Sequence, residues 1–508
     1  MTALSLADYA RVLKPWTATG SGDFSVGVKA VSNDSRRVVP GTLFCAIRGA
    51  RIDGHRFLDD AVEKGAAGVV ISADSSWTTP KGLPPVLKVT DSYRAWALLC
   101  ETFYGNPAAG MDVYAVTGTN GKTTIAFLLR RIFQTAFPDE KCGLLSTVEY
   151  DTGGPSCAES ARTTPDAENF QRLFAEMKAN HCARAAMELS SHGLHQHRTG
   201  SLLFAGAAFT NLTGDHLDYH LTMENYYQAK RILFTELLRP GAPAVVNADD
   251  EYCRRLRSEL AGAGRPVHSV TLHDEPGADI RVKNLKLKTS GADFLLETPW
   301  GKQPVHSVLT GEFNVCNLSL AASLAAACGV PLELIARIAS QPGIAPPGRL
   351  EAQEIAPDVR AFVDYAHTDD ALDRVLSTLR AVAERRIITV FGCGGDRDRT
   401  KRPRMAAAAA KWSDLVIITS DNPRTEDPMA IIDSIEEGIR RTASAYVVIE
   451  DRRQAIHYAL DMAQAGDVIV VAGKGHETYQ EINGVKHHFD DREIVEEYLR
   501  EGTHGLGT

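Results

Sequence analysis

A glycine-rich segment at residues 118–124, Gly-Thr-Asn-Gly-Lys-Thr-Thr, has the residue types needed to hold nucleotide phosphates. It lies between an apolar run at 112–117 and a second apolar run that begins at Ile125, as in a strand–turn–helix unit. Backbone N–H groups of such a turn and the positive end of the helix attract phosphate oxygens. Lys122 would neutralise the terminal phosphates, and the hydroxyl of Thr123 would bind Mg²⁺. The spacing is shorter than in the usual phosphate loop, and a chance turn is the alternative. The nucleotide contacts expected here are Gly118, Thr119, Asn120, Gly121, Lys122, Thr123 and Thr124.

Four loops in the last third of the chain carry glycine and charged residues directly after apolar runs. The runs cover residues 361–364, 387–391, 415–419 and 468–471. The loops read Tyr-Ala-His-Thr, Gly-Cys-Gly-Gly-Asp-Arg, Ser-Asp-Asn-Pro-Arg and Ala-Gly-Lys-Gly-His-Glu. Because ligands of open α/β sheets bind beyond the carboxyl ends of the strands, we expect the four loops to form one site.

The elements that must position these segments indicate an α/β fold of three domains. Apolar β-branched runs alternate with helical patterns after residue 108, which is typical of parallel sheets. Two segments rich in proline and glycine, at residues 104–110 and 341–348, interrupt the pattern of strands and helices. We therefore predict domains at residues 1–108, 109–346 and 347–508.

The bulk composition excludes several classes of protein. The net charge of −9 argues against wholesale nucleic-acid binding. Five basic residues lie between 397 and 404, but acidic neighbours and the absence of aromatic residues disfavour nucleic-acid contact, and most of the five read as a solvated helix start. The nine cysteines form no C-x-x-C pair, so a zinc-binding or redox motif is not supported. The N-terminus has no basic stretch followed by an apolar run, so no signal peptide is expected. Residues 318–330 are too short to cross a bilayer and predict a buried helix, so we expect a cytoplasmic protein that is not membrane-inserted.

The short phosphate loop resembles those of the Mur ligases and the folylpolyglutamate synthetases, which both activate a carboxylate as an acyl phosphate for attack by an amine. Further segments favour the Mur ligase family, and the resemblance covers nearly the whole chain. They are Asn33-Asp-Ser-Arg-Arg-Val-Val-Pro-Gly-Thr-Leu-Phe44, Met187-Glu-Leu-Ser-Ser-His-Gly-Leu-His-Gln-His-Arg198, Asp215-His-Leu-Asp-Tyr-His220, Gly392-Cys-Gly-Gly-Asp-Arg-Asp398, Asp421-Asn-Pro-Arg424 and Gly473-Lys-Gly-His-Glu477.

The resemblance implies a function for each domain: an N-terminal UDP-binding α/β domain, a central phosphate-loop ATPase-like domain with a parallel sheet, and a C-terminal Rossmann-like domain that binds the amino acid. The implied reaction joins meso-2,6-diaminopimelate to the D-Glu carboxylate of UDP-MurNAc-L-Ala-D-Glu, with ATP and Mg²⁺, during peptidoglycan precursor synthesis. The expected partners are these small molecules alone, and a monomer is expected. The alternatives are a ligase that adds L-lysine and a nucleotide-dependent binding module that no longer ligates.

The same resemblance implies the magnesium ligands. Glu188 and His216 would hold Mg²⁺ beside Thr123, and Lys230 would be carbamylated and so act as a carboxylate. A surface lysine is the alternative for Lys230. The clustered histidines between 192 and 220 also permit a transition-metal site.

Further residues are implied as ligand contacts. Asn317 would reach the adenine, Arg349 the γ-phosphate and Asp364 the ribose, while Asn314 alternatively caps a helix. The UDP-muramoyl-dipeptide would be bound by Asn33, Ser35, Thr163, Thr164, Ser190, Gln196 and Arg198, with Ala50, Arg51 and Ile52 near its UDP end. The amino acid would be bound by Arg397, Asp421, Asn422, Pro423, Arg424, Gly473 and Glu477. The fork of Arg424 suits the distal carboxylate of diaminopimelate, whereas a solvated arginine in an Asn-Pro turn is the alternative.

Overall fold

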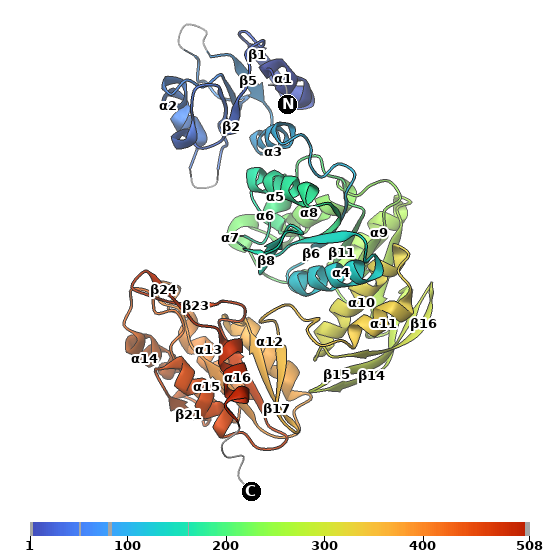
Figure 1. Cartoon of the computed structure of the whole chain (residues 1–508), viewed down its shortest axis with the longest axis vertical. Helices are drawn as coiled ribbons and strands as arrows, with labels where there is room; N and C mark the ends of the chain where they lie inside the picture. Colours follow the sequence, from blue (N-terminus) through green and yellow to red (C-terminus); the bar gives the residue numbers. More distant parts are fainter. Residues whose placement is uncertain (1–3, 50–51, 80–83, 161, 503–508) are drawn as a thin grey trace. The chain divides into compact units, whose positions relative to one another are not determined.

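The structure is a computed structural model that describes residues 4–49, 52–79, 84–160 and 162–502. Ala50 and Arg51, two of the residues predicted near the UDP end of the substrate, lie outside these ranges. The chain separates into two compact units, Met1–Ser269 and Val270–Thr508. Figure 1 labels many of the helices and strands named below. These units are defined by packing, and the two predicted borders, after residues 108 and 346, remain predictions.

The first unit begins with a small sheet of strand order β1-β5-β4-β3-β2, in which only β1 is antiparallel to its neighbour. Its elements are α1 (Leu6–Leu13), β1 (Thr17–Ser21), β2 (Ala30–Ser32), β3 (Thr42–Cys45), α2 (Leu58–Glu63), β4 (Gly68–Ser72), β5 (Val86–Val89) and α3 (Ser92–Phe103). Leu6, Tyr9 and Leu13 recur at helical spacing and bury one face of α1. Ser5 and Asp8 form a capping box that fixes where this helix begins.

A second sheet in this unit places β6 between β10 and β11, with all three strands parallel. This sheet has eleven strands in all, and those that lie wholly in the first unit are β6 (Asp112–Thr117), β7 (Lys141–Leu145), β8 (Glu149–Asp151), β9 (Ala158–Glu159), β10 (Cys182–Glu188), β11 (Gly206–Phe209) and β12 (Ala244–Asn247). The accompanying helices are α4 (Lys122–Ala136), α5 (Ala167–Ala179), α6 (Ser191–His195), α7 (Leu217–His220), α8 (Met223–Thr235) and α9 (Glu251–Gly262). The carboxyl ends of β6, β10 and β11 therefore meet at one edge.

The border between the two units falls within β13 (Val267–Thr271). The second unit continues with the antiparallel strands β14 (Ile280–Lys288), β15 (Gly291–Thr298) and β16 (Gly301–Ser307), then α10 (Glu312–Ala327) and α11 (Leu332–Ala339). The predicted buried helix at 318–330 is confirmed as the larger part of α10. Helix capping by Asn314 is wrong: Gly311 occupies the N-cap, and Asn314 is buried inside the first turn with its Nδ2 donating to the Thr310 carbonyl at 2.9 Å.

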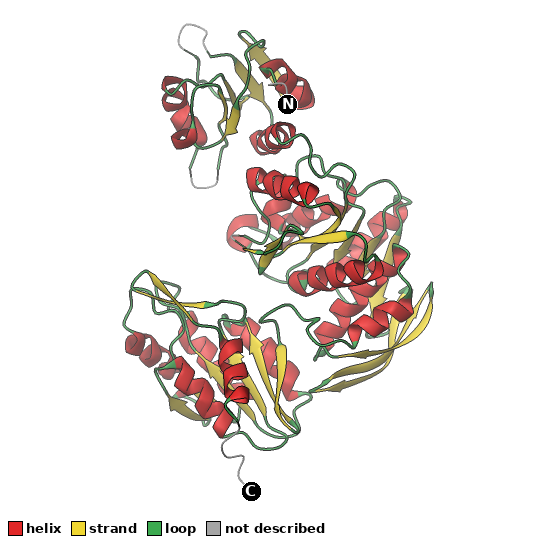
Figure 2. Ribbon diagram, viewed as in Figure 1, coloured by secondary structure: helices red, strands yellow, loops and turns green. Residues whose placement is uncertain are grey.

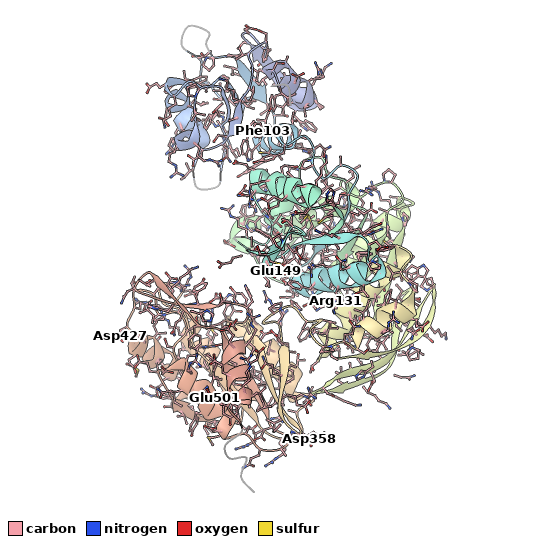
Figure 3. All side chains as sticks on the ribbon, in the orientation of Figure 1. Phe103, Arg131, Glu149, Asp358, Asp427 and Glu501 are labelled. Atoms are coloured by element: carbon pink, nitrogen blue, oxygen red, sulfur yellow. The ribbon has the colours of Figure 1, made fainter. Side chains whose placement is uncertain are left out.

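The last sheet has the order β17-β18-β22-β19-β20-β21, with only β17 antiparallel, and helices cover both of its faces (Figure 2). Its strands are β17 (Glu351–Ala356), β18 (Val359–Asp364), β19 (Ile387–Phe391), β20 (Leu415–Ile418), β21 (Ala445–Val448) and β22 (Val468–Ala472). Its helices are α12 (Asp369–Arg380), α13 (Lys401–Trp412), α14 (Pro428–Ile439), α15 (Arg452–Asp461) and α16 (Asp491–Arg500), and β23 (Tyr479–Ile482) with β24 (Val485–His488) forms a separate hairpin. Asp427, labelled in Figure 3, caps α14 by accepting the Met429 N–H at 3.0 Å.

The α/β fold class is confirmed, since parallel strands alternate with helices in each of these sheets. None of the helices in the described ranges is both long and apolar enough to cross a membrane.

Candidate active site

The phosphate loop lies where β6 ends between β10 and β11. Oγ1 of Thr117 donates to the Leu189 carbonyl at 2.7 Å, and the Thr210 N–H donates to the Thr117 carbonyl at 3.1 Å. Gly118 follows with a φ of 146°. A Cβ at this position would overlap Oγ1 of Thr210, so only glycine fits here.

The helix that follows brings its N-terminus to the loop. Gly121 is the N-cap of α4 with a φ of 83°, and Lys122, Thr123 and Thr124 form its first turn. The Lys122 side chain turns back onto the loop, where Nζ donates to the carbonyls of Gly118 at 3.0 Å and Thr119 at 2.8 Å. The strand, turn and helix predicted for residues 112–124 are therefore confirmed, and phosphate binding by the loop stays a prediction.

A second lysine reaches the same loop from α8. Lys230 is 1% exposed, and its Nζ donates to the Gly118 carbonyl at 2.8 Å and lies 4.6 Å from the centre of the Tyr226 ring. Burial, and then the nearby charge of Lys122, hold the pKa of Lys230 well below its usual value. The alternative of a solvated surface lysine is wrong, because this face of α8 packs against the phosphate loop.

The predicted magnesium ligands occupy the ends of neighbouring elements. Glu188 ends β10 and is 1% exposed, and both of its carboxylate oxygens accept hydrogen bonds from Thr147, from N–H at 2.7 Å and from Oγ1 at 3.1 Å. His216 is the N-cap of α7 with a φ of 53°. Burial lowers the pKa of His216; the charge of Asp215 opposes this shift, and the charge of Lys122 adds to it. The imidazole therefore tends to be neutral, the form that binds metals.

The histidine-rich segment near His216 gains no support as a transition-metal site. His192 lies with its ring centre 5.1 Å from that of His216 and 5.5 Å from that of His220. Within the described ranges, however, no three His, Cys, Asp or Glu side chains are grouped as ligands of one metal ion.

Most residues predicted to bind the muramoyl-dipeptide form one network beside Glu188. Oγ1 of Thr164 donates to the Glu188 carbonyl at 3.1 Å and accepts the Ser190 N–H at 2.9 Å. Arg198 donates from Nη1 to the Thr164 carbonyl at 2.7 Å and from Nη2 to Oε1 of Gln196 at 2.8 Å. Thr163 joins the same network, since its Oγ1 accepts from Oγ1 of Thr147 at 3.1 Å.

Asn33 and Ser35 lie on the other sheet of the first unit, directly after β2. Asn33 is exposed, whereas Ser35 is 6% exposed and begins a short 3₁₀ helix. Arg37 of that helix forms an ion pair with Glu168 of α5 at 2.6 Å. This pair connects the loop to the helix that follows Thr164.

Asn317, Arg349 and Asp364 belong to the second unit. Asn317 is buried in α10, and its Nδ2 donates to Oδ1 of Asn314 at 3.3 Å. Asp364 ends β18, its carboxylate accepts the N–H groups of Leu350 at 2.7 Å and Ala366 at 2.8 Å, and burial raises its pKa. Arg349 places Cζ 4.8 Å from the centre of the Tyr365 ring. Its buried Nε has no hydrogen-bond partner in the described part of the chain.

The four polar loops of the last sheet lie together, as predicted. The Gly473 N–H donates to the Asp364 carbonyl at 3.0 Å, and the Gly395 N–H donates to the Asn422 carbonyl at 2.9 Å. Nδ2 of Asn422 donates to Oε2 of Glu477 at 2.8 Å. These contacts join the loops after β18, β22, β19 and β20 at the carboxyl edge of the sheet.

Arg424 is enclosed by this loop cluster and adopts a φ of 54°. Its Nη1 donates to the Gly395 carbonyl at 2.8 Å, and Nε donates to Oε2 of Glu481 at 3.2 Å. The side chain is 19% exposed, so a solvated arginine in an ordinary turn is wrong. Pro423 precedes it and limits the backbone on that side.

Arg397 is exposed in the loop after β19. The predicted solvated helix start holds for its neighbours Arg399, 72% exposed, and Arg404, 58% exposed. It is wrong for Arg402, which is 2% exposed and pairs with Glu426 at 2.9 Å. That carboxylate compensates the charge that burial would otherwise penalise.

Three family models match successive parts of the chain. They are the catalytic domain of the Mur ligase family at residues 27–95, the Mur ligase middle domain at 116–326 and the glutamate ligase domain of Mur ligases at 348–475. The chain belongs to the Mur ligase family. It is thus a member of a family of ATP-dependent ligases.

Similar proteins cover almost the full length of this Mur ligase. The UDP-N-acetylmuramoyl-L-alanyl-D-glutamate–2,6-diaminopimelate ligase of Geobacter metallireducens is 41% identical and covers 98% of this chain and 99% of its own. The ligase of the same name from Gloeobacter violaceus is 44% identical over 93% of this chain and 94% of its own. A solved structure of a ligase with this name has a TM-score of 0.71 and 33% identity, and covers 99% of this chain and 100% of its own.

Three residues of this Mur ligase escaped the sequence prediction although they fix predicted site residues. Thr147 binds both oxygens of Glu188, and no local pattern marks it. Lys474 is fully buried, with Nζ donating to Oδ1 of Asn422 at 3.2 Å and to Oε2 of Glu477 at 3.3 Å. It lies within the segment Gly473–Glu477, which resembles the Mur ligases. Glu481 pairs with Arg424 from the hairpin.

Proposed function

We propose that this Mur ligase is of the MurE type and joins meso-2,6-diaminopimelate to the D-Glu carboxylate of UDP-MurNAc-L-Ala-D-Glu, converting ATP to ADP and phosphate. Relatives that carry this activity in their names match the chain over almost its whole length. The observation that carries the amine assignment is the enclosed position of Arg424 among the loops that hold Asp421, Asn422, Gly473 and Glu477.

The contacts of Arg424 suit a distal carboxylate. Nε and Nη1 bind the protein and fix the plane of the guanidinium, while Nη2 has no partner among the described residues. A carboxylate can bind such a fork through two parallel hydrogen bonds. Diaminopimelate has that second carboxylate, and lysine does not. Asn422 is 3% exposed, and both polar atoms of its side-chain amide are hydrogen-bonded within the protein. Its proposed role is therefore to orient the loop, while neighbouring residues of the loops make the polar contacts with the amino acid.

The phosphate loop supports ATP binding. The side chains of Lys122 and Lys230 both reach the Gly118 carbonyl, and the ammonium group of Lys122 places positive charge where the phosphates would lie. Lys122 would stabilise negative charge that develops during phosphoryl transfer. We propose Arg349 as a further anion-binding side chain, within the second unit, since its buried Nε has no partner among the described residues.

The surroundings of Lys230 support its carbamylation. A buried lysine with a lowered pKa is held partly as the neutral amine, the form that reacts with CO₂. The carbamate would be an anion beside Lys122 in place of a second cation. With Thr123, Glu188 and neutral His216 it would complete a mostly oxygen-based ligand set of the kind that Mg²⁺ prefers. When bound, Mg²⁺ would neutralise phosphate charge during the transfer.

The residues of the chain then mainly position the reactants. The network of Thr163, Thr164, Ser190, Gln196 and Arg198 would hold the muramoyl-dipeptide with its D-Glu carboxylate near the γ-phosphate. The carboxylate oxygen takes the γ-phosphoryl group and ADP leaves; the amine then attacks the acyl carbon, and phosphate leaves as the amide forms. Orientation and charge neutralisation account for most of the rate of such reactions.

The remaining proposals concern the molecule as a whole. We propose a monomer, because one chain supplies all residues of the candidate sites. We propose a cytoplasmic location, because all nine cysteines are free thiols, as is usual in reducing compartments.

A substrate panel tests the proposed function. ADP release should require both UDP-MurNAc-L-Ala-D-Glu and an amino acid, and meso-diaminopimelate should be used in clear preference to L-lysine. Preference for lysine would leave only the general ligase assignment. ADP release that is independent of the amino acid, or absent altogether, would favour the binding module.

A further inference from the structure

A fully buried ion pair lies in the second unit at the loops of the proposed amino-acid site. Arg452 begins α15 and Asp491 begins α16. Nε of Arg452 donates to Oδ1 of Asp491 at 2.8 Å, and Nη2 donates to Oδ2 at 2.7 Å. Both side chains are 0% exposed. Arg452 is thus fixed in one orientation by a bidentate pair.

The same guanidinium also binds one carbonyl at the end of β22 and one in the loop after β20. Nη2 donates to the Ala472 carbonyl at 3.0 Å, and Nη1 donates to the Ser420 carbonyl at 3.4 Å. The residues that follow these carbonyls are Gly473 and Asp421, both predicted to bind the amino acid. Arg452 therefore bonds to the last carbonyl before the site in two separate loops.

The two loops also touch each other at this point. A Cβ built on Gly473 would lie 2.6 Å from Oδ2 of Asp421 and 3.9 Å from Nη2 of Arg452. Such a separation leaves no space for a side chain at position 473. A small change in the spacing of the loops would therefore displace the Asp421 carboxylate.

Stability alone does not account for this pair. Removing two charges from water is costly, and apolar residues of similar volume often replace a buried ion pair with no loss of stability. No apolar side chain, however, can donate hydrogen bonds to the carbonyls of Ala472 and Ser420. The property particular to arginine here is its planar fork of donors.

We propose that Arg452 is a positioning residue for the amine-binding site: held by Asp491, it fixes the spacing between the loop of Asp421 and Asn422 and the loop of Gly473 and Glu477. The proposal rests on the proposed function, because it takes these loops as the diaminopimelate site. Arg452 itself is buried and does not touch the substrate.

The test compares the double variant Arg452→Met/Asp491→Leu with the wild type. We expect a similar melting temperature and a KM for diaminopimelate raised at least about tenfold, since misplacing a positioning group by 1 Å can cost on the order of 100-fold. The KM values for ATP and UDP-MurNAc-L-Ala-D-Glu should change less than about twofold. Arg452→Lys, which keeps the charge beside Asp491 but loses the fork, should give an intermediate KM for diaminopimelate.

A matched control is the pair Arg386–Asp467, in which Asp467 is also 0% exposed and the two side chains meet at 2.6 Å. It lies at the opposite, amino ends of β19 and β22. Arg386→Met/Asp467→Asn should leave the KM for diaminopimelate unchanged. The proposal is overturned if the Arg452 variants keep the wild-type KM for diaminopimelate, if all three KM values rise together, or if the control pair has the same effect. A wild-type enzyme that does not use diaminopimelate would instead overturn the proposed function.

Discussion

At the scale of single residues, carbamylation of Lys230 decides whether an amine or a carboxylate-like group lies beside the phosphate loop. Its ammonium group contacts the Gly118 carbonyl, and burial lowers its pKa. Lys230→Ala should lower kcat by roughly 100-fold or more, as removal of one stabilising group in an active site commonly does. Added formate or acetate should restore part of the activity, because a small carboxylate can take the place of the carbamate.

Arg231→Ala is the control on the same helix, since Arg231 pairs with Glu259 at 2.5 Å and is 36% exposed. That variant should retain kcat. Isotope-labelled bicarbonate should give a carbamate NMR signal in the wild type that Lys230→Ala lacks. Normal activity of Lys230→Ala, or no such signal, would contradict carbamylation.

Arg424 tests the identity of the amine at the same scale. A hydrogen bond to a charged group is worth roughly 1.5–3 kcal/mol, so Arg424→Ala should lower kcat/KM for diaminopimelate by about tenfold to a hundredfold. The KM values for ATP and the UDP-substrate should stay nearly constant. Arg399→Ala, which changes an exposed arginine of a neighbouring loop, is the matched control. Unchanged diaminopimelate use by Arg424→Ala would refute the assignment of this residue.

At the scale of elements, the connection between α7 and α8 is strained. Leu221 has a φ of 68° and a ψ of −40°, and the Thr222 N–H donates to the His220 carbonyl at 2.8 Å, which makes a γ-turn that leucine rarely adopts. The Leu221 side chain is 75% exposed, so it gains little from packing. The turn leads directly into the helix that carries Lys230.

Leu221→Gly should therefore stabilise the protein. Relief of strain of about 1–3 kcal/mol outweighs the backbone entropy of glycine, about 0.5–1 kcal/mol, for a net gain of about 1 kcal/mol. The midpoint of urea unfolding should rise. Leu217→Gly, in the helical turn just before, should lower it, because glycine weakens a regular helix. A lower midpoint for Leu221→Gly would show that the turn is not strained.

At the scale of the whole molecule, the free energy of unfolding should depend on pH through His476. Burial, followed by the charges of Arg349 and Arg492, lowers the pKa of His476 from 6.5 to about 4. The unfolded chain therefore takes up this proton at higher pH than the folded chain. The stability that His476 contributes is complete above pH 6.5 and is lost as the pH falls towards 4.

Chemical unfolding between pH 7 and pH 4 measures this effect. His476→Gln should lose less stability over that interval than the wild type, whereas His487→Gln, which changes an exposed histidine, should behave like the wild type. Identical slopes for wild type and His476→Gln would show that this histidine is protonated in the folded protein as readily as in the unfolded one.

The sequence by itself determined individual strands, turns and helices. The run at 112–117, the turn at Gly118 and the helix from Lys122 occur as predicted, because strand, turn and helix signals there agree within a few residues. The segment at 318–330 was recognisable as a buried helix for the same reason. The loops of the last sheet could be grouped in advance because parallel strands bring their carboxyl ends together.

Only the tertiary structure decided which polar side chains are buried. Lys230 meets a carbonyl 112 positions away, and Arg452 meets Asp491 across 39 positions. Helical spacing gives the faces of a helix but not the partner that covers each face, so surface lysine and buried lysine look alike in the sequence. The burial of Arg402 by Glu426 has no signal in the basic run around it, and no local pattern marks the contacts of Thr147. Such burial depends on long-range packing that compensates each charge, and that packing exists only once the chain has folded.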